Sequence, residues 1–227
     1  MTGIGLLADI PIWNGRQLAG NWDVIWYYTA QHVRYTLLSV SLGTMLSIPL
    51  AYFAIRRPSS YPALLAVTNA IYAIPSIALF VMLSPWLGFT NDKPIVLAMT
   101  LYTLVILVRN IVEAIRSVPD SVLRAADGMG YRPFARFVGV ELPLALPGIV
   151  AGLRLAVVST VSLISVGALI GRGGLGRLFT DGRARKIVVE LWSGVVAVVV
   201  LALVLDALLL LVGRFATPWQ RAGKSTA

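Results

Sequence analysis

The residues that could do chemistry in this chain are few. Its 227 residues include no cysteine and a single histidine, His32. A thiolate nucleophile, a disulfide framework and a cysteine-ligated metal are therefore excluded, and one histidine argues against any metal site. A nucleophile or general base with an orienting partner is not found either. The sequence predicts a protein that is not an enzyme and that holds no cofactor of its own.

Four charged residues lie inside otherwise apolar stretches: Arg109, Glu113, Arg154 and Asp206. Ionisable groups inside a bilayer usually face a helix bundle or a wet cavity. Arg109 and Glu113 are four residues apart, which places them on one face of a helix. Three of them lie at a similar depth. At about 1.5 Å per residue, Arg109, Arg154 and Asp206 are each on the order of 10–15 Å from the end of their span on the side of residues 119–147. We expect an intramembrane charge cluster, which would either stabilise the bundle by pairing or serve an inner gate.

Two stretches imitate nucleotide-binding motifs. Residues 171–176 fit G-x-G-x-x-G, but they follow an apolar segment rather than a strand of a βαβ unit. Residues 223–226, Gly-Lys-Ser-Thr, imitate the end of a P-loop, yet Pro218 stands where its first glycine belongs. We expect neither stretch to bind a nucleotide, so any energy source must belong to another subunit.

The composition predicts the elements that carry these residues. With 58% hydrophobic and 13% charged residues and a mean hydropathy of +0.82, the chain does not fit a soluble domain. Its net charge of +9 is interpreted as membrane-flanking Lys and Arg rather than as a nucleic-acid footprint. Five segments reach the roughly 20 residues that cross a bilayer; they are 35–55, 63–83 (with Pro75 inside), 95–115, 144–170 and 187–212. The fold class is all-α, a polytopic membrane helical bundle with about five transmembrane helices.

The ends of the chain flank this membrane domain of residues 35–212. Residues 1–34 are expected to form an extracytoplasmic N-terminal or interfacial segment, because tryptophan and tyrosine are frequent at 21–31. The alternative is that 21–31 is simply the start of the first spanning helix. Residues 213–227 form a tail. Gly148 and Gly152 make a G-x-x-x-G, which favours close helix approach within the chain.

The longest polar interruption, residues 119–147, predicts a helix–turn–helix. Pro119 followed by Asp120 and Ser121 is a helix-start signal, in which an acid or a hydroxyl can cap the first N–H groups. Val122, Ala126 and Met129 recur at helical spacing and predict one apolar face. Gly128 and Gly130 end this helix, and Pro133 can open a second one at its first position. Such an element is suited to the groove of a partner.

The spacing within this stretch resembles a known family. Ala125-Ala126, three residues, Gly130, nine residues, Val140, one residue and Leu142-Pro143 resemble the EAA loop of ABC importer permeases. Arg124 stands where that pattern has Glu, which leaves open the contact made at position 124. Residues 70–80, 108–115 and 141–149 resemble permeases for glycine betaine, choline and carnitine.

The resemblance implies a type I ABC importer fold and the function of a permease for a compatible solute. The closest alternative is a methionine or other amino-acid importer of the same architecture, and a secondary transporter or channel is a more distant one. The implied partners are ATPase subunits, which bind the ATP and Mg, a second permease that is identical or homologous, and an extracytoplasmic substrate-binding protein. The resemblance also assigns the ATPase-coupling role within loop 117–143 to Arg124, Ala125, Ala126, Asp127, Gly128, Met129, Gly130 and Tyr131.

The translocation path is expected to include residues from two regions. Tyr72 and Tyr102 are aromatic residues of predicted spans. Gly171, Gly173, Gly174 and Gly176 resemble the segment after the penultimate helix of osmoprotectant permeases, where glycines permit tight excursions of the backbone. An ordinary flexible turn is the alternative for the four glycines.

The resemblance also implies an orientation in the bacterial cytoplasmic membrane. If 119–147 is cytoplasmic, five crossings place the N-terminus outside and the C-terminus inside. Nine Lys and Arg then lie inside and eight outside, which decides nothing by the positive-inside rule. Five of the eight belong to residues 171–186, and we expect this basic outer loop to contact an acidic binding protein.

Overall fold

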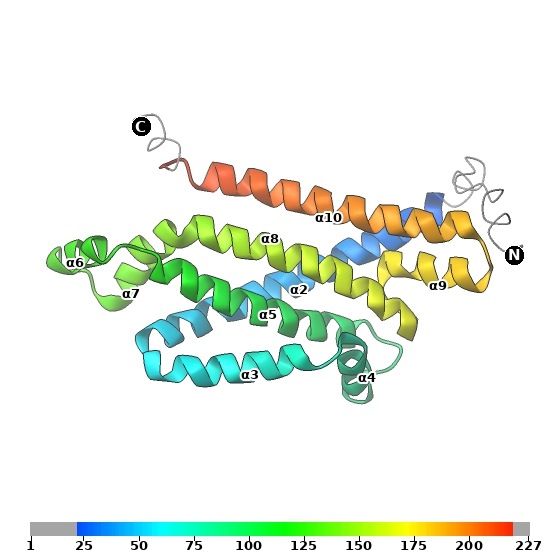
Figure 1. Cartoon of the computed structure of the whole chain (residues 1–227), viewed down its shortest axis with the longest axis horizontal. Coiled ribbons are helices and arrows are strands. Elements are labelled where there is room, and N and C mark those ends of the chain that lie inside the picture. Colours follow the sequence, from blue (N-terminus) through cyan, green and yellow to red (C-terminus); the bar gives the residue numbers. More distant parts are fainter. Residues whose placement is uncertain (1–21, 220–227) are drawn as a thin grey trace, which may run out of the picture. The chain divides into compact units, whose positions relative to one another are not determined.

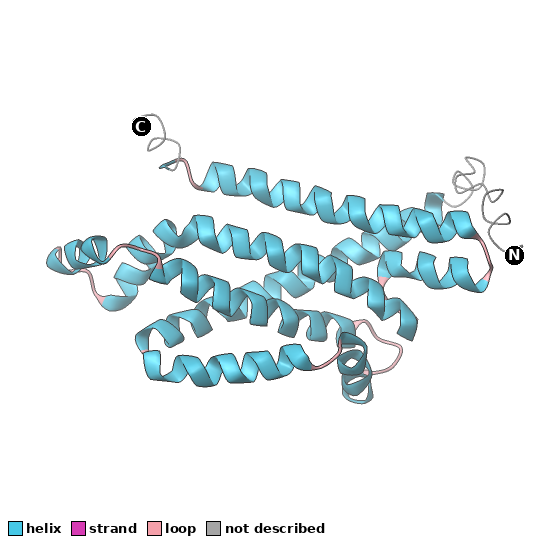
Figure 2. Cartoon of the chain, in the orientation of Figure 1, coloured by secondary structure: helices cyan, strands magenta, loops and turns pink. Residues whose placement is uncertain are grey.

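The computed structural model describes residues 22–219, and within that range the chain is built from helices and contains no strand (Figure 2). In chain order the helices are α2 (Trp22–Arg56), α3 (Tyr61–Ala73), α4 (Ser76–Leu87), α5 (Lys93–Arg116), α6 (Asp120–Gly128), α7 (Pro133–Arg136), α8 (Leu142–Val166), α9 (Arg177–Ala184) and α10 (Val188–Ala216). Short turns supplement them: η2 (Pro58–Ser60), the π-helical η3 (Phe137–Glu141), η4 (Gly167–Ile170) and η5 (Gly174–Gly176). Figure 1 labels the helices.

Four continuous helical stretches of the described chain are long and apolar enough to span a membrane, and α3 with α4 would make a fifth. The first begins at Trp22, thirteen residues before the predicted span. Residues 22–31 are therefore the start of that helix, as the alternative interpretation held, and the boundary expected after residue 34 falls inside α2. Residues 1–21 and the P-loop-like 223–226 lie outside the described residues.

The segment predicted at 63–83 is interrupted at Pro75. Helix α3 ends at Ala73, Ile74 is extended with φ −70° and ψ 126°, and α4 begins at Ser76. The ring of a proline disfavours the helical conformation of the residue before it, which explains why the break falls at Ile74. Tyr102 Oη donates a hydrogen bond to the Ile74 carbonyl, which the break leaves without a helical partner.

The described residues form two compact units. The first contains residues up to Ser39, Pro75–Met99 and Ser159–Val204, and the second contains Val40–Ile74, Thr100–Val158 and the residues from Leu205. Helices α2, α5, α8 and α10 contribute to both units. Each unit is described by itself.

The core of the second unit gathers apolar residues of α2, α5, α8 and the π-helical turn. Ala51, Leu107, Ile111 and Phe137 are fully or almost fully buried in it. The predicted close approach at the G-x-x-x-G occurs between α8 and α5: a Cβ at Gly148 would lie 2.8 Å from Ala114 Cβ, and one at Gly152 would lie 2.6 Å from Asn110 Cβ.

The core of the first unit is organised around His32, which is fully buried. Its Nε2 lies 3.0 Å from the Val161 carbonyl, and its Nδ1 lies 3.3 Å from the backbone nitrogen of Leu175. The Leu175 N–H must donate to Nδ1, so the neutral ring carries its proton on Nε2 and donates it to Val161. One imidazole therefore joins α2, α8 and the glycine-rich loop.

Candidate functional site

The polar loop between α5 and α8 folds into two short helices. Pro119 precedes α6 with an extended ψ of 136°, and its carbonyl accepts hydrogen bonds from the backbone nitrogens of Val122 (3.0 Å) and Leu123 (3.3 Å). No side chain caps the first turn of α6. The expected cap by an acid or a hydroxyl is therefore not made, and Asp120 contributes only a favourable charge at the helix start.

Gly130 turns the chain between the two helices. Its φ is +82°, its nitrogen donates to the Asp127 carbonyl (3.0 Å), and the Tyr131 nitrogen donates to the Ala126 carbonyl (3.2 Å). These bonds close the end of α6 in the way that a left-handed residue after a helix permits. Helix α7 then begins with Pro133 at its first position, as the sequence predicts.

The face of α6 that packs against the chain differs in one residue from the apolar face that the sequence predicts. Val122, Leu123 and Ala126 pack against or lie within the chain's own core, and Ala126 is fully buried. Met129 follows the end of α6 and is 70% exposed, so the prediction that it completes one apolar face is wrong. Ala126 therefore offers no surface to a partner, whereas Ala125 is exposed.

Four large apolar residues of this loop are exposed, and we refer to them together as the loop patch: Met129, Tyr131, Phe134 and Val138. Sequence reasoning missed Phe134 and Val138, although large apolar residues in a loop rich in arginine are a detectable signal. Arg124, which stands at the glutamate position of the EAA pattern, is also exposed.

A buried carboxylate fixes the loop to the membrane helices. Glu141 is 2% exposed, and its Oε1 accepts hydrogen bonds from Arg56 Nη2 (2.9 Å) and Arg136 Nε (2.8 Å). Arg56 Nη2 also donates to the Pro133 carbonyl (2.7 Å), and Arg136 Nη1 donates to Asp127 Oδ1 (2.6 Å). This Glu141 network joins the end of α2, both short helices and the start of α8. It was not predicted.

The four membrane charges form two separate ion pairs. Arg154 donates from Nε and Nη2 to the two carboxylate oxygens of Asp206, each at 2.7 Å. Arg109 donates from Nε to Glu113 Oε1 at 3.0 Å, within one helix. The structure thus joins these residues in two pairs rather than in the single cluster that we expected.

A polar cavity of about 370 Å³ lies beside the second pair, within the second unit. Its lining comprises Leu65, Thr68, Asn69, Tyr72, Val105, Ile106, Arg109, Asn110, Glu113 and Leu155. Tyr72 is half exposed here. Tyr102 is buried instead, with its ring edge-on to Tyr72 at a centroid distance of 5.6 Å, so it supports Tyr72 rather than lining the cavity.

The glycine loop is tightly packed. Gly173, Gly174 and Gly176 are buried, and only Gly171 of the four is exposed. A Cβ would lie 2.4 Å from the Ala168 nitrogen at Gly173, 2.7 Å from His32 Cβ at Gly174 and 2.3 Å from the Ser165 carbonyl oxygen at Gly176. Glycine is required at these three positions for close backbone contact, so they are not an ordinary flexible turn, and the place of the loop on a translocation path stays a prediction.

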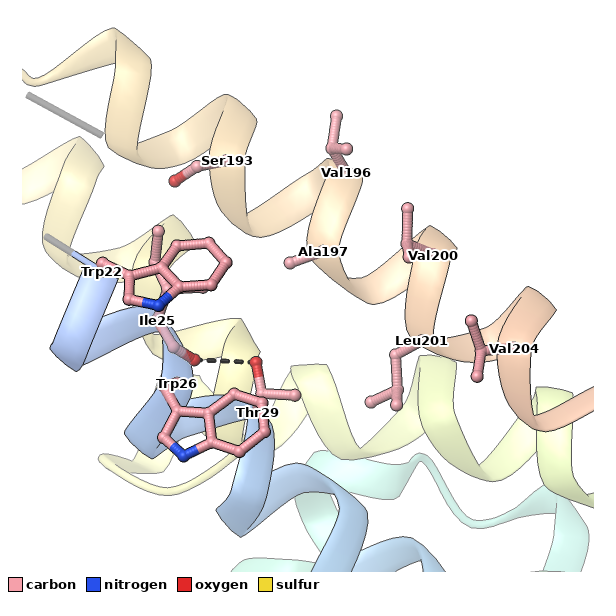
Figure 3. A pocket seen from close by; sticks show the side chains of 10 residues that line it. All are labelled: Trp22, Ile25, Trp26, Thr29, Ser193, Val196, Ala197, Val200, Leu201 and Val204. Atoms are coloured by element: carbon pink, nitrogen blue, oxygen red, sulfur yellow. Dashed lines mark hydrogen bonds between the residues drawn. The ribbon is translucent and has the colours of Figure 1, made fainter. Parts of the chain in front are cut away.

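A larger groove of about 850 Å³ lies between the start of α2 and α10 in the first unit (Figure 3). Two of its lining residues are polar, and both hydroxyls are bonded within their own helices: Thr29 donates to the Ile25 carbonyl and Ser193 to the Glu190 carbonyl, each at 2.7 Å. Apart from these hydroxyls, the polar groups that its side chains offer are the indole N–H groups of Trp22 and Trp26. Within residues 22–219 no group of three metal-ligating side chains occurs.

Comparisons with known proteins agree on one family. The family described as "Binding-protein-dependent transport system inner membrane component" matches residues 43–221. The chain is 35% identical over 185 residues to the osmoprotectant import permease protein OsmW of Salmonella typhimurium, covering 80% of this chain and 86% of the relative. It is 30% identical over 201 residues to the choline transport system permease protein OpuBB of Bacillus subtilis, covering 88% and 92%.

The solved structures give the fold. An inward-facing MetNI methionine ABC transporter matches with a TM-score of 0.71 at 22% identity, over 86% of this chain and 95% of that chain. This likeness confirms the expected all-α, polytopic fold of a type I importer permease.

Proposed function

Because the chain belongs to the family of binding-protein-dependent transport system inner membrane components, we propose that it is the permease subunit of an ATP-driven importer for a quaternary ammonium compatible solute. The observation that supports this substrate class is the identity of 30–35% to osmoprotectant and choline permeases over at least 80% of the chain. The likeness to a methionine transporter is 22% identical and concerns the fold alone.

In this proposal the α6–α7 loop is the contact with the ATPase. The loop patch and the exposed Arg124, Ala125 and Gly130 supply the docking surface, while the buried Ala126 and the partly buried Leu123 hold α6 on the membrane helices. The Glu141 network gives this surface a rigid connection to α2 and α8. Movement of the docked ATPases would therefore be transmitted to the spanning helices, as alternating access requires.

The remaining partners follow from the family. The importer would contain ATPase subunits that bind ATP and Mg, a second permease that is identical or homologous, and a binding protein on the extracytoplasmic side. The α6–α7 loop would then lie in the cytoplasm, with the N-terminus outside and the C-terminus inside. The permease itself would carry no catalytic site.

Uptake by the reconstituted complex tests this function. The permease is purified with its ATPase and binding protein, and uptake of labelled glycine betaine into proteoliposomes is measured with ATP inside. We expect ATP-dependent uptake that unlabelled choline or carnitine reduces and methionine does not. Competition by methionine alone would favour the amino-acid importer, and uptake without ATP would favour a secondary transporter.

A further inference from the structure

We propose that the polar cavity between α3 and α5 is a substrate subsite for zwitterionic betaines, in which Arg109 receives the carboxylate while Glu113 and the Tyr72 ring receive the quaternary ammonium. The inference rests on the proposed function and deepens it, because it assigns to this chain a contact with the solute itself.

The helical spacing creates this site. Thr68, Asn69 and Tyr72 occupy one face of α3, and Arg109, Asn110 and Glu113 occupy one face of α5. Residues three and four apart lie on the same side of a helix, so each helix places three polar side chains along the cavity, beside Leu65 of α3 and Val105 and Ile106 of α5. All the lining residues belong to the second unit.

The Arg109–Glu113 pair is exposed on the surface of this chain. The side chains are 67% and 58% exposed, although α5 is long and apolar enough to span a bilayer. Charged groups at such positions face protein or water rather than lipid, because lipid contact is costly. Arg154 and Asp206 differ, with 34% and 27% exposure and two hydrogen bonds. Arg154 and Asp206 form a bidentate pair, whereas Arg109 donates a single hydrogen bond to Glu113.

The charges of the cavity match those of a betaine. An arginine and a glutamate side by side have no net charge, so a zwitterion can enter without leaving an unbalanced charge. The guanidinium accommodates a carboxylate in a bidentate arrangement. A quaternary ammonium has no N–H to donate, so it is held by a carboxylate charge and by the face of an aromatic ring. The cavity volume of about 370 Å³ is sufficient for a small solute.

Contacts with neighbouring residues fix the position of the Tyr72 ring. Its ring is braced edge-on by Tyr102 with an interplanar angle of 82°, and Tyr102 is fixed by its hydrogen bond to Ile74. The Ile74 carbonyl is available only because Pro75 interrupts the α3–α4 segment. The broken helix therefore positions the aromatic side of the cavity.

Direct binding tests the proposal. The permease–ATPase complex is placed in lipid nanodiscs without binding protein and titrated with glycine betaine or choline by calorimetry or ligand-observed NMR. We expect saturable binding of glycine betaine and weaker binding of choline, which lacks the carboxylate. Arg109→Gln should weaken glycine betaine binding about tenfold, to the choline level, while Arg109→Lys should retain part of it. A tenfold loss corresponds to about 1.4 kcal/mol.

The other two residues have their own matched variants. Glu113→Gln and Tyr72→Ala should weaken both ligands several-fold, whereas Tyr72→Phe, which keeps the ring, should bind nearly as wild type. Val67→Ala, exposed on α3 outside the cavity, is the control. Thermal unfolding is measured for each variant, and the exchange of Arg109→Glu with Glu113→Arg keeps the pair if a single change does not fold.

The outcomes distinguish a failure of the subsite proposal from a failure of the proposed function. Uptake of glycine betaine by the wild type together with unchanged binding in Arg109→Gln would overturn the subsite alone. Failure of the wild-type nanodisc complex to bind either ligand, with uptake intact, would do the same. Absence of uptake of any quaternary ammonium compound would overturn the proposed function on which the subsite rests.

Discussion

Two glycines of the α6–α7 loop lie two residues apart and differ in what they require. Gly130 has a φ of +82°, where an added Cβ is strained even though nothing lies within 4 Å of its position. Gly128 is the last residue of α6, has ordinary helical geometry and also has open space around it. Substitutions at the two positions therefore separate the backbone conformation from simple bulk.

We predict that Gly130→Val uncouples ATP hydrolysis from transport. The left-handed conformation costs a β-branched residue on the order of 1–2 kcal/mol, so the turn should relax and displace the docking surface. No membrane contact is removed, so the spanning helices should still assemble. Binding-protein-stimulated ATPase activity and uptake are measured in proteoliposomes, with Gly128→Val as the matched control. Wild-type values of both in Gly130→Val would mean that this turn is not the coupling element.

We predict that Asp206→Asn lowers expression and thermal stability, because it leaves Arg154 charged without its bidentate partner. Adding Arg154→Gln removes that charge as well, so the double variant should recover part of the loss. Yield and melting temperature of the purified permease are compared for the two single variants and the double variant. Equal losses in single and double variants would show that the pair does not act as a unit.

At the scale of elements, the Glu141 network determines how the α6–α7 loop is held. One carboxylate connects Arg56 at the end of α2 with Arg136 of α7. Arg136 extends the network to Asp127, which is 54% exposed. The network therefore has a buried centre, Glu141, and an exposed edge, Asp127. We expect the buried centre to contribute more to the free energy of unfolding than the exposed edge.

We predict that Glu141→Gln destabilises the complex by about 1.5–3 kcal/mol, the range for hydrogen bonds to a charged group. It should also lower uptake per ATP hydrolysed, because a neutral amide oxygen holds Arg56 and Arg136 more weakly than the carboxylate and the loop is tied less firmly to α2. Asp127→Asn removes only the exposed edge and should cost less than about 1 kcal/mol. Denaturation and coupling ratios are measured together. Similar effects of both variants would contradict a central role for Glu141.

Local sequence signals predicted the elements more completely than their contacts. The turn at Gly130 and the start of α7 at Pro133 depend on neighbouring residues, so the sequence predicts both. The Glu141 network required knowledge that the end of α2 approaches the start of α8, which no local pattern contains. The sequence predicted Met129 on the apolar face of the helix because apolar residues recur at helical spacing up to that position, although α6 ends one residue earlier. The glycine loop was ambiguous because its packing partner, His32, lies more than 130 residues away.

At the scale of the whole molecule, the basic residues after α8 complicate the orientation. Among the arginines of the expected outer loop, Arg172 pairs with Asp92 (2.8 Å), Arg177 lies 3.5 Å from Asp181, and Arg185 pairs with Glu190. Three of the five basic residues therefore take part in ion pairs within the first unit. These arginines therefore have a structural role in this unit, and the extracytoplasmic location of the loop stays a prediction.

The last prediction is that this loop is accessible from outside the cell. Because the chain contains no cysteine, one introduced at the exposed Ala184 of α9 would be the only thiol. An impermeant maleimide should label Ala184→Cys in intact cells, or in spheroplasts where an outer membrane is present. Ser59→Cys, exposed in η2 between α2 and α3, should be labelled only after the membrane is opened. The two sites are predicted to lie on opposite sides, so each serves as the control for the other. The reverse pattern would invert the proposed topology, move the α6–α7 loop away from any cytoplasmic ATPase and exclude contact between the basic loop and a binding protein.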